Sequence, residues 1–264
     1  ANLNTARTDL AGAGIQTAAL AFGGSVPPNT GATELYDGTS WTEVNDLNTA
    51  RSLLAGCGTS TAGLAFGGNE DTETWNGTNW TEVNNLNAAK DALGGFGTNT
   101  SALAFGGSEP GGNTANTELW NGTNWTEVNN LGGAKRFVAG AGADNTTGLC
   151  FGGNPGPTAN TELWNGTNWA EVNNLNTARN QLAGLGTQPS ALAFGGEGPP
   201  NLAITELWNG TSWSEQSDLN AAVRFNAGAG TTTAGLSFGG DNGPVKAATE
   251  SWNVPSNVVK TLTD

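Results

Sequence analysis

Short apolar stretches alternate along this chain with clusters of Gly, Asn and Thr. Residues 10–13 and 18–22 are typical apolar stretches, and residues 37–40 are a typical polar cluster. No stretch of ten residues has apolar positions at helical spacing without an intervening Gly or turn cluster. Apolar stretches of this length, bounded by turn residues, are typical of β-strands. The pattern therefore predicts an all-β protein with negligible helix.

This alternation recurs as a repeat that aligns on the tripeptide Phe-Gly-Gly. The tripeptide occurs six times, at separations of 44, 39, 46, 43 and 44 residues. The consensus unit is LNTAR-xxLAGxGT-xxALAFGG-(3 to 9 variable residues)-TELWNGTNWTEVNN. Periods of this length are typical of solenoids and propellers. The units tile nearly the whole chain, so we predict a single domain over residues 1–264, with repeats at 3–46, 47–85, 86–130, 131–174, 175–218 and 219–264.

Each unit predicts four short strands, LAGxG, ALAF, TELW and WTEV, with an Asn-Gly turn between the last two. Four such strands cannot bury their own faces, whereas closure into a ring buries them and leaves only short edges. The first strand is rich in small residues, and tryptophans end the third strand and begin the fourth. This gradient of size predicts a six-bladed β-propeller with the small residues at the channel. Tryptophans at these fixed positions could be sugar-stacking platforms, but we favour a core between the blades.

The motif ALAFGG…TELWNGTNW resembles the kelch repeat, in which apolar residues precede Gly-Gly and an aromatic residue and a Trp follow. The resemblance covers essentially all 264 residues and implies a kelch-like propeller. Two departures are that Trp mostly replaces the usual Tyr and that the turn between the third and fourth strands is shorter. The units are nearly identical and rich in Asn, Thr and Gly, and in this they also resemble kelch-like repeats in virion proteins of marine bacteriophages.

The sixth unit departs from the others after Trp252 because it lacks the Asn-Gly turn and the second Trp. A β-branched run at 254–261 nevertheless predicts a fourth strand there. Each blade would then consist of one contiguous repeat, and packing of blade against blade would close the ring.

Composition excludes several classes of function. The formal net charge is −14 and the pI is near 4.2, so binding to nucleic acid or to anionic membranes is not expected. The absence of His excludes Ser-His-Asp and Cys-His catalysis and His-liganded metals. It also excludes the copper-radical oxidases of kelch-like architecture, which need Tyr, Cys and His ligands. The chain has no run of about 18 apolar residues, which is the length that a membrane-spanning helix needs. We expect no cofactor, no bound metal and no catalytic residue.

Two sets of side chains could still carry chemistry. Cys57 and Cys150 fall in strands of non-adjacent blades, which predicts two buried free thiols. A Glu recurs in the third strand of every unit, and a base recurs near the start of five units. An acidic ring that binds a cation is one interpretation. We favour ion pairs between blades, each joining a Glu to the base that opens the next blade. The six Glu are Glu34, Glu73, Glu118, Glu162, Glu206 and Glu250, and the bases are Arg7, Arg51, Lys90, Lys135 and Arg179.

The segment between Gly-Gly and Thr-Glu varies most between units. These loops span 25–32, 69–71, 108–116, 154–160, 197–204 and 241–248, and we expect them on one face around the channel mouth, although unconstrained drift would also make them vary. Few aromatic or Arg anchors occur in them, so a single contact would be weak and many copies would act together. The candidate recognition residues are Asn29, Glu70, Asp71, Glu109, Asn113, Asn154, Asn201, Asp241 and Asn242.

These observations predict a non-enzymatic interaction module on a phage virion surface or tail fibre, or otherwise extracellular. Its expected partners are other virion subunits or a host-surface glycan or protein. The alternative is a secreted carbohydrate-active enzyme or a lectin with its site at the channel mouth. Several carboxylates and an Arg that converge in one pocket would favour the enzyme, and shallow Asn, Thr and Pro loops would favour recognition or assembly.

Overall fold

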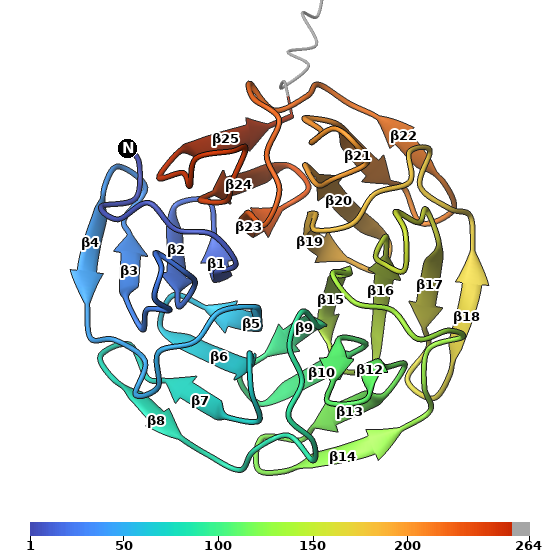
Figure 1. Ribbon diagram of the computed structural model, residues 1–264, viewed down its shortest axis with the longest axis horizontal. Coiled ribbons are helices and arrows are strands. Elements are labelled where there is room, and N and C mark those ends of the chain that lie inside the picture. The colour runs from blue at the N-terminus through green and yellow to red at the C-terminus, as the bar shows by residue number, and fades with distance from the viewer. Residues whose placement is uncertain (255–264) are drawn as a thin grey trace, which may run out of the picture.

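The computed structural model describes residues 1–254, which form six antiparallel sheets in a ring around a central channel (Figure 1). Five sheets have four strands each, and the sixth has three within the described residues. None of residues 1–254 is helical. The predicted six-bladed β-propeller is therefore confirmed, and it is consistent with a kelch-like repeat fold. The fourth strand predicted for the last unit falls on residues 255–264, outside the described part.

Within each blade the strands run outward from the channel in chain order. Blade one contains β1 (Ala11–Ile15), β2 (Ala18–Phe22), β3 (Thr33–Tyr36) and β4 (Trp41–Val44). Blade two contains β5 (Leu54–Thr59), β6 (Ala62–Gly67), β7 (Thr72–Trp75) and β8 (Trp80–Glu82). Blade three contains β9 (Gly94–Thr98), β10 (Ser101–Phe105), β13 (Thr117–Trp120) and β14 (Trp125–Val128), with the small hairpin β11 (Ser108–Glu109) and β12 (Gly112–Asn113) in its variable loop.

The other three blades repeat this order. Blade four contains β15 (Ala139–Asp144), β16 (Thr147–Phe151), β17 (Thr161–Trp164) and β18 (Trp169–Val172). Blade five contains β19 (Ala183–Thr187), β20 (Ser190–Phe194), β21 (Thr205–Trp208) and β22 (Trp213–Glu215). Blade six contains β23 (Ala227–Thr231), β24 (Ala234–Phe238) and β25 (Thr249–Asn253).

One glycine near the start of each innermost strand contacts the phenylalanine of the preceding blade. A Cβ atom added to Gly56 would lie 2.3 Å from Cζ of Phe22, and one added to Gly184 would lie 2.6 Å from Cζ of Phe151. No side chain fits at that distance, so the small residues of LAGxG allow the blades to approach one another at the channel. The predicted gradient from small inner to large outer residues is confirmed.

The tryptophans form the core between the blades. Trp120 is fully buried and Trp125 is 5% exposed, with their ring centroids 5.3 Å apart. Trp125 packs on Phe66 of the preceding blade at 5.0 Å, and its Nε1 donates a hydrogen bond to Thr72 Oγ1 of that blade at 2.9 Å. This burial confirms an inter-blade core rather than exposed sugar platforms.

The junction between blades six and one uses the same contacts as the junction between blades one and two. Trp41 Nε1 of blade one donates to Thr249 Oγ1 of blade six at 3.1 Å. The Leu3 amide donates to the Ala247 carbonyl at 2.8 Å, as the Leu47 amide donates to the Gly31 carbonyl at 3.0 Å one junction later. Contiguous repeats therefore form the blades over the described residues, and hydrogen bonds as well as packing close the ring.

The predicted pairing of Glu with the base of the next blade is wrong, because each ion pair lies within one repeat. Arg179 contacts Glu206 of its own repeat at 2.8 Å, and its Nη2 also donates to the Ala193 carbonyl of the same blade at 3.2 Å. The base precedes the first strand, and each of the three arginines of this set also donates to a carbonyl group in the second strand of its own blade. The other pairs are Arg7–Glu34, Arg51–Glu73, Lys90–Glu118 and Lys135–Glu162.

The same glutamates also hold the linkers between blades. Glu206 Oε2 accepts a hydrogen bond from the Asn176 amide at 2.7 Å, and Glu118 Oε2 accepts one from the Asn87 amide at 2.8 Å. Five of these carboxylates are thus paired with a buried base and a main-chain amide, which supports a structural role. Both cysteines are free and buried, as predicted.

Candidate functional site

The variable loops and the segments that precede the first strands lie together on one face of the ring. The Arg136 amide donates to the Asn154 carbonyl at 3.0 Å, and the Arg224 amide donates to the Asp241 carbonyl at 3.0 Å. Equivalent bridges join Thr8 to Ser25 and other pairs around the ring. Since the segments before the first strands border the channel, the loops surround one channel mouth. This is the arrangement expected from the connectivity of a four-stranded blade.

Several predicted recognition residues hold the loops in shape. Asp71 accepts a hydrogen bond from Asn69 Nδ2 at 2.8 Å within its own loop, and Glu109 accepts one from Asn116 Nδ2 at 3.0 Å. Asn113 donates to the Asn154 carbonyl of the next blade at 3.2 Å. Other predicted residues face solvent, namely Asn29, Glu70 and Asn242, while Asn201 and Asp241 are half-buried.

A ring of residues at the channel mouth was not predicted from the sequence. These residues, here called the mouth ring, occupy the same position in every repeat, one or two residues before the first strand. Each amide donates to the carbonyl of its counterpart in the preceding blade at 2.7–3.2 Å, and the Asp9 amide completes the circle by donating to the Phe225 carbonyl at 3.2 Å. All six have φ between 52° and 58°. The mouth ring consists of Asp9, Leu53, Ala92, Phe137, Gln181 and Phe225.

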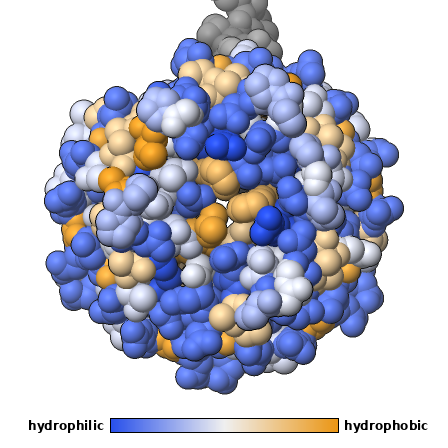
Figure 2. Space-filling model, in the orientation of Figure 1, coloured by the Kyte–Doolittle hydropathy of each residue, from blue (hydrophilic) through white to orange (hydrophobic). Residues whose placement is uncertain are grey.

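Side chains of the mouth ring differ sharply from one blade to the next. Phe137 and Phe225 meet in an edge-to-face pair with centroids 5.5 Å apart and planes at 74°. The guanidinium of Arg136 lies over the Phe137 ring at 4.9 Å, and that of Arg224 over Phe225 at 5.4 Å. Both pairs are at cation–π distance. Figure 2 shows apolar and strongly hydrophilic residues side by side around the central opening.

Carboxyl groups gather beside one of these arginines. Arg224 contacts Glu197 at 2.9 Å and Asp241 at 3.6 Å. Burial raises the pKa of Asp9 to about 6; the charge of Asp241 adds to this rise, while a hydrogen bond with Thr8 and the charge of Arg224 oppose it. The mouth therefore carries a guanidinium, an aromatic pair and a carboxyl group that is neutral in mild acid.

Metal and nucleophile chemistry finds little support in the described part of the chain. Residues 1–254 contain no group of three or more His, Cys, Asp or Glu side chains placed to hold a metal ion. Burial raises the pKa of Cys150 to about 12 and also raises that of Cys57, so both thiols stay protonated. No helix in this part of the chain has the length and apolar character to cross a membrane.

The sequence contains one signal for the mouth ring. The two positions written xx in the consensus, before LAG, vary as strongly as the loops do, although the residues around them are nearly constant. Comparisons with known proteins add nothing to this picture, since no family model and no curated protein matches the chain.

Proposed function

We propose that the protein is a non-enzymatic recognition module that binds its partner with the mouth surface, defined as the mouth ring, the residue before each of its members and the six variable loops. One observation carries the proposal. The repeats differ mainly at these positions, which are separate in sequence yet adjacent in the fold. Variation confined to loops on a rigid scaffold is typical of binding surfaces.

The centre of this surface offers the anchors that the loops lack. Aromatic and Arg side chains dominate the energetic centres of protein interfaces. Phe137 and Phe225 are half-buried, so part of each ring is open to a partner. Within residues 1–254, Arg136 forms no ion pair, and its guanidinium is available to a carboxylate or hydroxyl group. Binding of one partner molecule at the mouth is then stronger than binding through the variable loops alone.

The setting that we propose is a phage particle, with the protein as a virion surface or tail-fibre domain. The resemblance of the repeats to kelch-like repeats in virion proteins of marine bacteriophages supports this setting. The partner would be a host-surface glycan or protein, or another virion subunit. Display in many copies would multiply the strength of each contact through effective concentration.

Two kinds of variant test the proposal. In one, residues 108–116 are replaced by Asn-Glu-Asp, the loop of the second repeat. In the other, Phe137 and Phe225 are both changed to Ala. Attachment to host cells, measured by co-sedimentation, should fall at least tenfold, because hot-spot residues cost more than 2 kcal/mol on truncation. Ile15→Ala is the control, since Ile15 is 52% exposed at the opposite end of the first strand. Equal attachment by all variants with native denaturation curves would contradict the proposal.

A second candidate is an enzyme that cleaves sugars at the channel mouth. The observation that favours it is the approach of Asp9, Asp241 and Glu197 to Arg224, with the raised pKa of Asp9 suited to a general acid. Incubation with bacterial polysaccharides, followed by an assay for new reducing ends, separates the candidates. Release that disappears in Asp9→Asn would establish the enzyme, and no release is expected of a recognition module.

A further inference from the structure

Five of the six junctions between blades contain one and the same tryptophan contact. Between blades four and five, Trp213 Nε1 donates to Thr161 Oγ1 at 3.1 Å, and its ring centroid lies 4.9 Å from Phe151 and 5.5 Å from Trp208. The other four junctions have equivalent Trp–Thr hydrogen bonds at 2.9–3.1 Å. At five junctions, therefore, the space between adjacent blades is filled by a tryptophan of the fourth strand.

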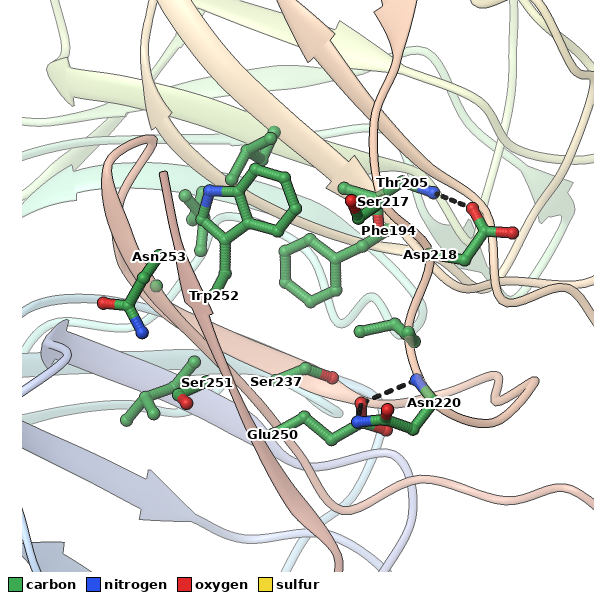
Figure 3. A pocket seen from close by; sticks show the side chains of 15 residues that line it. Phe194, Thr205, Ser217, Asp218, Asn220, Ser237, Glu250, Ser251, Trp252 and Asn253 are labelled. Atoms are coloured by element: carbon green, nitrogen blue, oxygen red, sulfur yellow. Dashed lines mark hydrogen bonds between the residues drawn. The ribbon is translucent and has the colours of Figure 1, made fainter. Parts of the chain in front are cut away.

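The junction between blades five and six has the same walls without the tryptophan. Phe194 and Thr205 of blade five stand at the repeat positions of Phe151 and Thr161, and Trp252 of blade six faces them (Figure 3). Together with neighbouring residues they line a cavity of about 280 Å³. None of the tryptophans among residues 1–254 donates a hydrogen bond to Thr205. Trp252 Nε1 donates to the Thr232 carbonyl, as the third-strand Trp208 donates to the Gln188 carbonyl in blade five.

The outer strand of blade six is also free along one side in the described part. In blade five, β21 pairs outward with β22, and Trp208 stands opposite Trp213. In blade six, β25 pairs inward with β24, and within residues 1–254 no strand pairs with its outer edge. Trp252 is consequently half-buried, whereas Trp208 is 1% exposed. A strand that adds to this edge would bring a side chain opposite Trp252.

We propose that this cavity and the outer edge of β25 are a docking site for an extended segment of a partner protein that carries a tryptophan. The segment pairs with β25 as β22 pairs with β21, which is recognition by strand addition. Its indole enters between Phe194 and Trp252, and its Nε1 donates to Thr205 Oγ1. Residues 255–264 contain no aromatic residue, so these residues do not supply the indole, and we assign it to the partner.

The test uses the protein's own fourth strand as the probe. The peptide NGTNWTEV, with the sequence of residues 121–128, is titrated into the full chain by calorimetry, and NGTNATEV serves as the control peptide. We expect one saturable site for the first peptide and affinity at least about tenfold lower for the second, because the indole is the anchor. Thr205→Val should weaken binding roughly fivefold by removing one hydrogen-bond acceptor.

Two further variants make the result specific. Thr161→Val removes the same hydroxyl at a filled junction and should leave the affinity for the peptide unchanged. Asn257→Trp places a Trp five residues after Trp252, the spacing of the other repeats, and should abolish binding by filling the cavity from within. The proposal is overturned if the full chain does not bind the peptide, if both peptides bind equally, or if the two Thr variants lose affinity equally.

Discussion

Within residues 1–254, the junction where the two ends of the ring meet is more complete than the junction one blade earlier. Between blades six and one, Trp41 packs on Phe238 with centroids 5.1 Å apart and donates to Thr249. Between blades five and six, Phe194 and Thr205 face a cavity. The less complete junction is therefore not the one at which the first and last repeats join.

The reason is the direction in which the blades pack. Each fourth strand contributes its tryptophan to the preceding blade, so the first repeat fills the junction with blade six. The tryptophan missing from the sixth repeat is missing from the junction with blade five. A defect in one repeat therefore appears one junction upstream, and the closure of the ring is unaffected.

The largest effect should come from opening a junction that is now full. Trp125→Ala removes a 5%-exposed indole from between blades two and three, and we expect the free energy of unfolding to fall by about 3–5 kcal/mol. Trp252→Ala should cost about half as much, because that ring already borders a cavity. Urea denaturation measures both, and equal losses would contradict the difference between the junctions.

The ion pairs offer the next largest contrast. Glu162→Gln leaves Lys135 buried without its partner, and we expect a loss of about 2–4 kcal/mol. In the sixth repeat Val223 replaces the base and Glu250 is half-exposed, so Glu250→Gln should cost less than about 1 kcal/mol. A stoichiometric bound cation that disappears with Glu162→Gln would show that the carboxylate is a metal ligand instead.

Filling the incomplete junction should stabilise the protein. Asn257→Trp supplies the tryptophan at the spacing of the other five repeats, and burial of an indole predicts a gain of about 2 kcal/mol in the free energy of unfolding. Asn257→Ser is the matched control, with no gain expected. If the two variants unfold alike in urea, the new indole does not enter the cavity.

The smallest effect concerns pH at the junction of the chain ends. Asp9 has a pKa near 6, raised by burial above its ordinary value of 3.8. Between these values the folded carboxyl group keeps a proton that the unfolded one has lost, so its contribution to stability is present below pH 4 and is lost as the pH rises through about 6. Asp9→Asn should remove this loss of stability. At pH 8 we expect its free energy of unfolding to exceed that of the native chain by about 1 kcal/mol, because partial solvent exposure limits the difference. Equal pH profiles of the two proteins would contradict the raised pKa.

The repeat was sufficient to predict the blades, their strand order and the tryptophan core. The constant order of Gly-Gly, Trp and Asn-Gly defines strands and turns, and small residues in the first strand indicate where the blades converge. The partner of each Glu was not predictable in this way. From its position in the sequence, each Glu could pair with the base of its own repeat or with that of the next. Contacts with carbonyl groups of the second strand, such as that of Ala193, keep the arginine in its own blade.

The mouth ring was not predictable for a different reason. Positive φ is unusual for Leu53 or Phe137, and no local sequence preference indicates it. The circle of hydrogen bonds between blades imposes it, and that circle exists only once the ring has closed. The cavity between blades five and six was foreseeable in part, since the missing second Trp of the sixth repeat is visible in the sequence. The sequence does not show which junction contains the cavity, because this depends on the direction in which each fourth strand packs against its neighbouring blade.

The circle of main-chain hydrogen bonds at the mouth has a consequence for evolution. Amide and carbonyl groups alone hold these six positions, so a mutation there exchanges a side chain without disturbing the frame. None of the present residues is β-branched, the class that positive φ tolerates least, and most other types remain available. Gene copies of this protein could diverge into a repertoire of different partners while inheriting one unchanged architecture.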